Sequence, residues 1–141
     1  MRLFVQGCLL VLAMCSAVRA EEPAKVPEPL QMTRTETDLI TFVNIERGRR
    51  GLHPLVVDGN LLLTTRRHAH WMAGSHRMQH GSYPVGEIIA MGQPTTMAAI
   101  NTWLNSSGHR AHVLSQSWRR CGVAAYTSPS GRVYWCMQFL R

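Results

Sequence analysis

The chain has 141 residues, of which 45% are hydrophobic and 16% are charged, and its formal net charge is +7 at pH 7. This length supports one compact core rather than two, and the sequence contains no internal repeat. The arginines are scattered instead of forming a basic stripe interleaved with aromatic residues, which argues against a nucleic-acid-binding function.

The first 20 residues have the pattern of a secretory signal peptide. Arg2 precedes an apolar run from Leu3 to about Ala17, which is too short for a membrane-spanning helix of about 20 residues. We therefore expect cleavage after Ala20, a secreted or periplasmic protein, and no transmembrane segment in the mature chain. An uncleaved anchor and a lipid attached to Cys15 are the alternatives.

Residues 21–33 predict an extended, proline-rich linker, and residues 34–141 predict the folded domain. Loss of Arg2 and Arg19 with the signal peptide leaves 13 basic and 8 acidic residues, a net charge of +5. This charge favours contact with anionic envelope polymers or lipid head groups. A soluble surface that is simply basic is the plainer interpretation.

Capping residues and apolar periodicity predict three helices, followed by a short helical turn at residues 109–114. The first helix begins at Thr35 or Thr37 and ends at Gly51, the second begins at Asp58 or Asn60, and the third runs from residues 94–96 to Gly108.

Strands are expected at residues 85–90, 121–127 and 132–140. The last two flank a Ser-Pro-Ser-Gly turn and therefore predict a hairpin. Helices early in the chain and strands late in it indicate an α+β fold, in which helices cover an antiparallel sheet.

Four cysteines are present, and Cys8 and Cys15 leave with the predicted signal peptide. In an oxidising compartment the two cysteines that remain in a small domain usually pair. Folding the chain about the hairpin turn brings Cys121 roughly opposite Cys136, so we expect a cross-strand disulfide. Two reduced, buried thiols are the alternative.

His80, Glu87 and His109 are the candidate site residues. Imidazole and carboxylate groups bind zinc or a similar divalent metal, and they also transfer protons near neutral pH. His112 lies three residues after His109 and is a possible accessory ligand on the same helical face. The alternatives are surface or capping histidines and an exposed carboxylate at the end of a strand.

These motifs, in this order, resemble the CAP superfamily of secreted cysteine-rich, antigen 5 and pathogenesis-related domains. The matching segments are Val43-Asn44, Gly51-Leu52, Pro54-Leu55, His68-Ala69, His80, Gly86-Glu87, Trp103, residues 107–110, Gly122-Val123 and Tyr134-Trp135. The resemblance implies an α-β-α sandwich with an open cavity on which His80, Glu87 and His109 converge. It also implies that the two histidines bind metal and that Glu87 is their partner or a proton acceptor.

The sequence departs from the family pattern at three places. Ile88 replaces the Asn of a Gly-Glu-Asn turn, His112 replaces another Asn, and a second cavity Glu has no counterpart. We therefore expect a secreted, non-enzymatic CAP domain that holds a divalent metal or small ligand and meets an extracellular or envelope partner. A zinc-assisted hydrolase or protease with Glu87 as general base is the second hypothesis, and a structural envelope protein with a vestigial cavity is the third.

Overall fold

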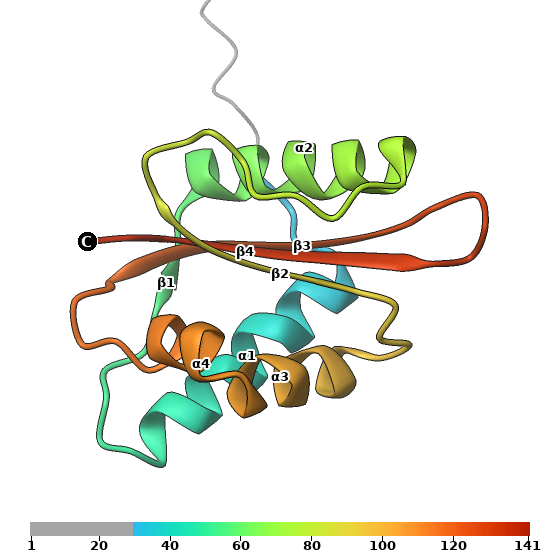
Figure 1. The fold of residues 1–141 in the computed structure, drawn as a ribbon. Helices are drawn as coiled ribbons and strands as arrows, with labels where there is room; N and C mark the ends of the chain where they lie inside the picture. The colour runs from blue at the N-terminus through green and yellow to red at the C-terminus, as the bar shows by residue number, and fades with distance from the viewer. Residues whose placement is uncertain (1–29) are drawn as a thin grey trace, which may run out of the picture.

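The computed structural model describes residues 30–141, whose arrangement is drawn in Figure 1. Their elements in chain order are α1 (Arg34–Gly48), β1 (Val56–Val57), α2 (Gly59–Ser75), β2 (Gly86–Met91), α3 (Thr96–Asn105), α4 (Ser107–Val113), β3 (Arg120–Thr127) and β4 (Val133–Leu140). The predicted signal peptide, the cleavage after Ala20, the lipid anchor at Cys15 and most of the linker lie outside the described residues.

The four strands of residues 30–141 form one sheet in the order β1-β3-β4-β2. β4 is antiparallel to both β2 and β3, which confirms the predicted hairpin and the mainly antiparallel sheet. β1 was not predicted, and it pairs in parallel with β3. Main-chain hydrogen bonds from Val56 N–H to Arg119 and from Asp58 N–H to Cys121 hold this two-residue strand at the edge.

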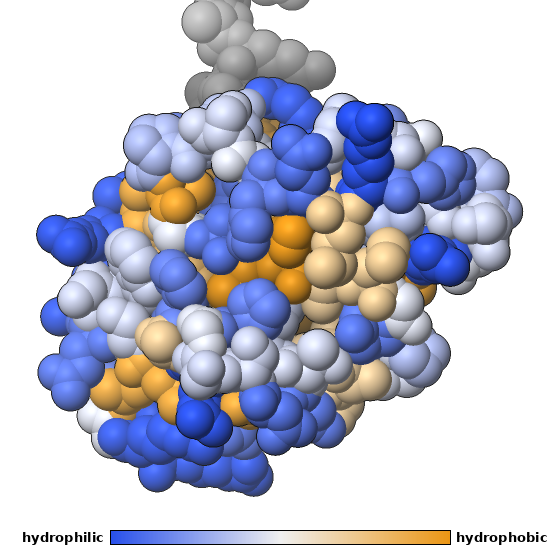
Figure 2. All heavy atoms as spheres, in the orientation of Figure 1, coloured by the Kyte–Doolittle hydropathy of each residue, from blue (hydrophilic) through white to orange (hydrophobic). Residues whose placement is uncertain are grey.

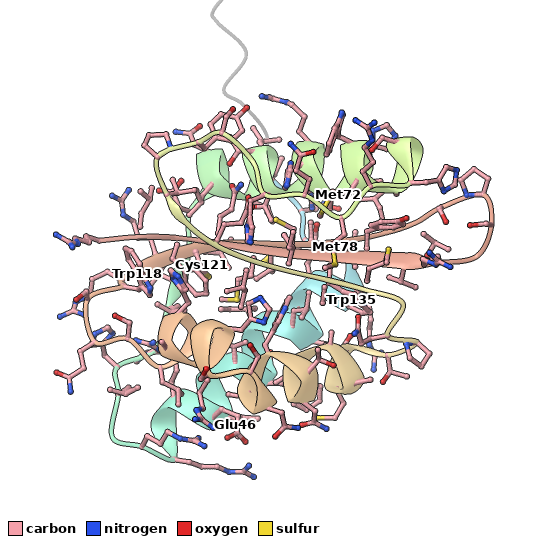
Figure 3. All side chains as sticks on the ribbon, viewed as in Figure 1. Glu46, Met72, Met78, Trp118, Cys121 and Trp135 are labelled. Atoms are coloured by element: carbon pink, nitrogen blue, oxygen red, sulfur yellow. The ribbon has the colours of Figure 1, made fainter. Side chains whose placement is uncertain are left out.

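Helices cover both faces of the sheet, with α2 on one face and α1, α3 and α4 on the other (Figure 1). Successive residues of a strand point to opposite faces, so Ile88 of β2 packs into the cluster with α1 and α3, whereas Ile89 packs against α2. Figure 3 shows Met72 on the α2 side of the sheet and Trp135 on the other side. The expected α-β-α sandwich is confirmed.

The first helix begins earlier than predicted, because Thr33 rather than Thr35 or Thr37 is its cap. The Thr33 hydroxyl accepts from Glu36 N–H, and the Glu36 carboxylate accepts from Thr33 N–H at 2.7 Å. This capping box satisfies two main-chain donors. Arg66 of α2 also donates to Glu36 at 2.6 Å, so the start of α1 is joined to the helix across the sheet.

The third helix ends earlier than predicted, and the helical turn expected at residues 109–114 is present as α4, which begins two residues earlier, at Ser107. α3 ends at Asn105, Ser106 has an extended conformation, and α4 begins at Ser107, so Gly108 lies inside α4 rather than ending α3. This division places His109 and His112 on a separate short helix.

Arg47 fixes the position of α4 from within the core. Its side chain is fully buried and donates to the main-chain carbonyls of His53, Val113 and Ser115 at 2.8–3.0 Å. His53 lies in the loop after α1, and Val113 and Ser115 lie at the end of α4. One guanidinium therefore connects the loop after α1 with the end of α4. Burial lowers the pKa of Arg47, but three carbonyl acceptors compensate much of the lost hydration.

The predicted disulfide between Cys121 and Cys136 is wrong. Cys121 pairs with Phe139 in the hairpin and Cys136 pairs with Ala124, so the two side chains point to opposite faces of the sheet. Cys121 packs in the α1 and α3 cluster, whereas Cys136 packs against α2. Both are free, buried thiols. Burial raises the pKa of Cys121 to about 12 and that of Cys136 well above its ordinary value.

Candidate functional site

The candidate site lies where the loop between α2 and β2 passes the free edge of the sheet. β2 is an edge strand, because the strand order places it beside β4 alone. Figure 2, in the orientation of Figure 1, shows hydrophobic residues at the level of the sheet and mostly hydrophilic residues around them. His80 comes from the loop, and Glu87 is the second residue of β2.

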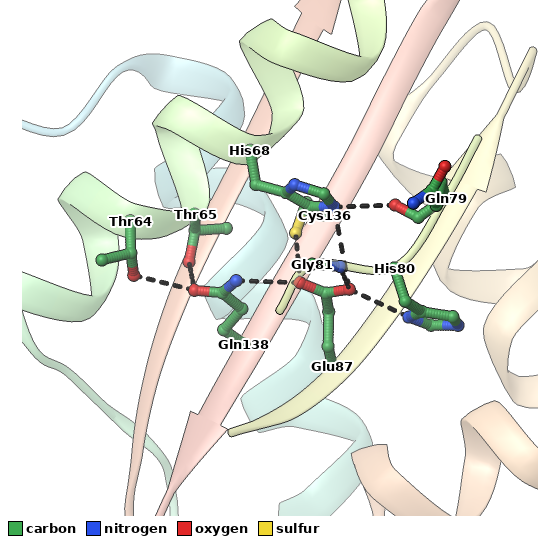
Figure 4. Close-up of polar contacts among 9 residues, drawn as sticks. All are labelled: Thr64, Thr65, His68, Gln79, His80, Gly81, Glu87, Cys136 and Gln138. Carbon is green, nitrogen blue, oxygen red and sulfur yellow. Dashed lines mark hydrogen bonds and ion pairs between the residues drawn. The ribbon is translucent and has the colours of Figure 1, made fainter. Parts of the chain in front are cut away.

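The Glu87 carboxylate accepts hydrogen bonds from two separate segments, the loop before β2 and strand β4 (Figure 4). Its Oε1 atom lies 2.9 Å from Nδ1 of His80 and 2.9 Å from the main-chain nitrogen of Gly81. Its Oε2 atom accepts from the Gln138 amide at 2.8 Å, and Sγ of Cys136 lies 3.9 Å from the same atom. The carboxylate is therefore bonded on both oxygens.

These contacts keep Glu87 ionised although its side chain is only 7% exposed. Burial alone raises the pKa, but the hydrogen bonds from Gln138, Gly81 and His80 and the charge of His68 outweigh it, and the pKa of Glu87 falls below its ordinary value. An ionised carboxylate only accepts hydrogen bonds. The Nδ1 atom of His80 must consequently donate, and in the neutral imidazole the Nε2 atom then carries a free lone pair.

Gln138 holds the carboxylate from the centre of the sheet. It is fully buried, and it is the cross-strand partner of Glu87. Its amide oxygen accepts from the hydroxyls of Thr64 and Thr65 of α2, at 2.8 and 3.1 Å. α2 approaches closely enough for these contacts because Gly122 lies beneath it, where an added Cβ would stand 2.4 Å from the Leu61 carbonyl oxygen.

His68 of α2 completes this side of the site. Its Nε2–H donates to the Gln79 carbonyl at 2.8 Å and lies 3.7 Å from Oε1 of Glu87. The ring is buried and stacks on Trp71, with centroids 5.7 Å apart. His68 therefore holds the loop that carries His80 against α2.

His109 and His112 lie on α4, on the opposite side of the sheet from α2. The pKa of His109 is lowered mainly by burial, and also by electrostatic repulsion from His80 and His112. The Nδ1 atoms of His109 and His112 are buried and have no hydrogen-bond partner within residues 30–141. His109 therefore belongs to the helical layer on the other side of the sheet from α2.

His112 lies in an aromatic cluster instead of facing the Glu87 carboxylate. Its ring stacks with Trp118 and Phe139, with centroids 5.9 and 5.8 Å apart. The close approach requires Gly86, where an added Cβ would be 3.1 Å from Nδ1 of His112 and 2.7 Å from the Trp118 ring. Gly86 and Glu87 project to opposite faces of β2. His112 therefore lies on the α4 face of the sheet, whereas the Glu87 carboxylate lies on the α2 face, and His112 could be an accessory ligand only on the α4 face.

The structure therefore joins His80 to Glu87 directly, whereas it places His109 on α4 without a contact to the carboxylate. Sequence reasoning matched His68 to the family pattern without assigning it to the site, and it missed Gln138. Both had a signal: His68 falls on the apolar face of α2, and Gln138 is a lone amide within the apolar run of β4.

A divalent metal fits this donor set in part. His80 Nε2 and the unpartnered Nδ1 atom of His109 are available lone pairs, and a carboxylate that orients the other nitrogen of a ligating histidine is a common feature of metal sites. Within residues 30–141, however, no three His, Cys, Asp or Glu side chains are arranged to hold a metal ion. A metal here would take its remaining ligands from water or from a bound molecule.

Comparison with known proteins identifies the family. The model of the cysteine-rich secretory protein (CAP) family matches residues 40–139. The chain is 28% identical over 129 residues to the uncharacterized protein YkwD of Bacillus subtilis, covering 79% of this chain and 49% of that protein. It is 29% identical over 83 residues to pathogenesis-related protein 1 of Arabidopsis thaliana, covering 57% and 52%. The chain spans about half the length of these curated relatives.

Solved structures have the same fold. An outer surface protein from Borrelia burgdorferi superposes with a TM-score of 0.70 at 16% identity, over 78% of this chain and 94% of that one. An extracellular protein containing a SCP domain from Bacillus anthracis gives 0.68 at 22% identity, over 80% and 45%. These relatives are described as outer-surface or extracellular proteins. None of the helices in residues 30–141 is long and apolar enough to cross a membrane.

Proposed function

The chain belongs to the cysteine-rich secretory protein (CAP) family, and from this membership we propose that it acts outside the cytoplasm as a non-enzymatic binding domain, with His80 and His109 as ligands for a divalent metal ion such as zinc. The observation that carries the proposal is the hydrogen bond between His80 Nδ1 and the buried carboxylate of Glu87.

This hydrogen bond prepares His80 as a ligand. The carboxylate holds the Nδ1–H tautomer and the ring orientation, so Nε2 keeps its lone pair and the ring loses little freedom on binding. The side chain remains 60% exposed, and an ion can therefore approach it from solvent. Glu87 makes the ligand more basic without itself coordinating.

His109 supplies the second ligand in this proposal. Its buried Nδ1 atom has no partner within the described residues, and a buried polar atom without a partner is costly unless water or a ligand satisfies it. The neutral form, which burial favours, is the form that binds metals. Two protein ligands leave other coordination positions open, which suits capture of a small external ligand.

The same contacts count against the hydrolase hypothesis. A general base must reach the proton of an attacking water, whereas both oxygens of Glu87 already accept from His80, Gly81 and Gln138. Its lowered pKa also makes it a weaker base.

Metal analysis of untagged protein, purified from an oxidising compartment, tests the proposal. We expect about one zinc per wild-type chain and none in the His80→Ala/His109→Ala variant. His70→Ala is the matched control, because His70 is an exposed histidine of α2 that packs on Tyr126 instead of Glu87. Zinc retained by the double variant would refute the assigned ligands. A folded wild type that binds no divalent metal would instead favour the vestigial cavity of a structural protein.

A further inference from the structure

A separate pocket of about 230 Å³ lies between α2 and residues 79–83. His68 and Trp71 line it from the helix, and Tyr83 lines it from the loop. Its remaining walls carry polar groups of Gln79 and Ser82, and His80 stands at its border with the candidate metal site. Neither the metal proposal nor the fold requires an aromatic wall here.

Two aromatic rings are exposed at this pocket and are held in place. Trp71 and Tyr83 are each 42% exposed. Trp71 stacks nearly parallel on His68, at an interplanar angle of 12°, and the Tyr83 hydroxyl accepts from Arg67 at 3.1 Å. Large rings that are fixed but exposed give contact area at little entropic cost on binding. They form two ready stacking surfaces for a ring-shaped ligand.

Polar groups accompany these rings. The side chains of Gln79 and Ser82 are exposed, and within residues 30–141 neither has a hydrogen-bond partner. An amide and a hydroxyl that both donate and accept can pair with neighbouring sugar hydroxyls. A pocket with aromatic walls and a few free polar groups therefore suits a sugar ring better than an aliphatic chain.

The surroundings of the pocket are positively charged. Residues 59–86 contain Arg66, Arg67 and Arg77 and four histidines, and no Asp or Glu. Arg66 is engaged by Glu36, whereas Arg67 and Arg77 are exposed. The nearest carboxylate, Glu87, is buried. This asymmetry favours a negatively charged ligand.

We propose that this pocket binds an acidic sugar residue of an extracellular or envelope polysaccharide, with Trp71 and Tyr83 stacking on the ring and Arg67 near its carboxylate. The proposal goes beyond the metal site and does not depend on an ion at His80. It gives the protein a polymeric partner of defined chemistry, recognised one residue at a time in the pocket between α2 and residues 79–83.

Calorimetric titration of the full chain with tetragalacturonate tests the inference. The comparison ligands are a neutral tetrasaccharide of glucose and polyphosphate, which carries charge without sugar rings. We expect tetragalacturonate to bind more tightly than either one. Trp71→Ala should weaken this binding about tenfold, in the range of other ring-on-aromatic contacts, and Trp71→Phe should restore most of it.

Matched variants distinguish this pocket from the metal site and from the far face of the sheet. Met97→Ala removes an exposed apolar side chain from α3, on the other face of the sheet, and should bind like the wild type. His109→Ala should also bind normally, with or without a chelator, even if it loses metal, because His109 does not line the pocket. Circular dichroism confirms that each variant is folded.

The proposal would be overturned if folded wild type did not bind tetragalacturonate, if the neutral tetrasaccharide bound equally well, or if Trp71→Ala left binding unchanged. Polyphosphate binding that matches tetragalacturonate would indicate a general basic surface and would overturn it as well.

Discussion

Replacement of Gln138 by leucine isolates the polar contact on which the candidate site depends. Gln138 is fully buried, and its amide donates to the ionised carboxylate of Glu87 at 2.8 Å. Leucine has a similar volume, so the substitution mainly removes hydrogen bonds rather than creating a cavity. The carboxylate then keeps its contacts to His80 and Gly81 on one oxygen and loses its main donor on the other.

The magnitude follows from the individual contacts. A hydrogen bond to a charged group contributes about 1.5–3 kcal/mol. Loss of the Gln138 amide oxygen does not leave the hydroxyls of Thr64 and Thr65 without an acceptor, because both can donate to the Leu61 carbonyl oxygen at 2.6–2.9 Å. We therefore expect Gln138→Leu to lower the free energy of unfolding by about 2–3 kcal/mol, which is a decrease of about 1–2 M in the urea midpoint.

Gln93→Leu is the matched control. Its amide oxygen is buried and has no hydrogen-bond partner in residues 30–141, so the same chemical change removes no hydrogen bond from this oxygen and should be neutral or stabilising. Urea unfolding followed by circular dichroism measures both variants, and unchanged slopes support a direct comparison. A Gln138→Leu variant within about 0.5 kcal/mol of wild type, or a Gln93→Leu variant that is equally destabilised, would refute the assigned role of the buried contact.

Three further predictions test the described contacts. Gly86→Ala should destabilise by about 1–3 kcal/mol, because its Cβ would stand 2.7 Å from the Trp118 ring; Gly108→Ala, with open space around it in α4, should be neutral or stabilising in the same thermal melt. The pKa of Glu36 is lowered, since its bonds to Arg66 and to the helix start outweigh burial. The ionised Glu36 therefore contributes stability above the unfolded pKa of about 4.3, and this contribution is lost as pH falls through the folded pKa. Wild type should consequently lose more stability on acidification than Glu36→Gln. Equal slopes of stability against pH for the two proteins would contradict this. Dithiothreitol should leave the unfolding midpoint unchanged because both cysteines are free, whereas a reductant-dependent midpoint would contradict the register of the hairpin.

Local capping patterns predicted the helices well, and competing caps displaced their ends. Thr33 is followed three residues later by Glu36, the pattern of a capping box, and this reciprocal pair prevails over Thr35 and Thr37. Gly108 is typical of a helix end in isolation, but the chain already turns at Ser106. The start of α1 is decided by the pair Thr33 and Glu36, and the end of α3 is decided by the turn at Ser106. The start of α1 is also held by the hydrogen bond from Arg66 of α2 to Glu36.

The cysteine prediction failed because a disulfide depends on strand register. The turn at residues 128–131 lies seven residues after Cys121 and five before Cys136, so the two cysteines are unequally distant from it and cannot face each other. A one-residue difference in register also moves a side chain to the other face of the sheet. The presence of two strands was predictable from local composition, whereas the pairing between them depends on the turn.

The same distinction explains which parts of the site were predictable. His80 and Glu87 are seven residues apart, and their contact joins one loop to the strand that follows it. Gln138 meets Glu87 only because β2 pairs with β4, and no local pattern specifies that pairing.

The orientation of the His80 ring depends on contacts between elements that meet only in the assembled sheet. The Glu87 carboxylate orients the His80 ring, and the Gln138 amide orients that carboxylate. The Gln138 amide is held in turn by the Thr65 hydroxyl of α2. Each contact crosses from one element to another, so a small displacement of α2 from the sheet reaches the imidazole through three hydrogen bonds. The orientation of His80 is therefore a property of the packed domain, and an isolated peptide containing the loop would not reproduce it.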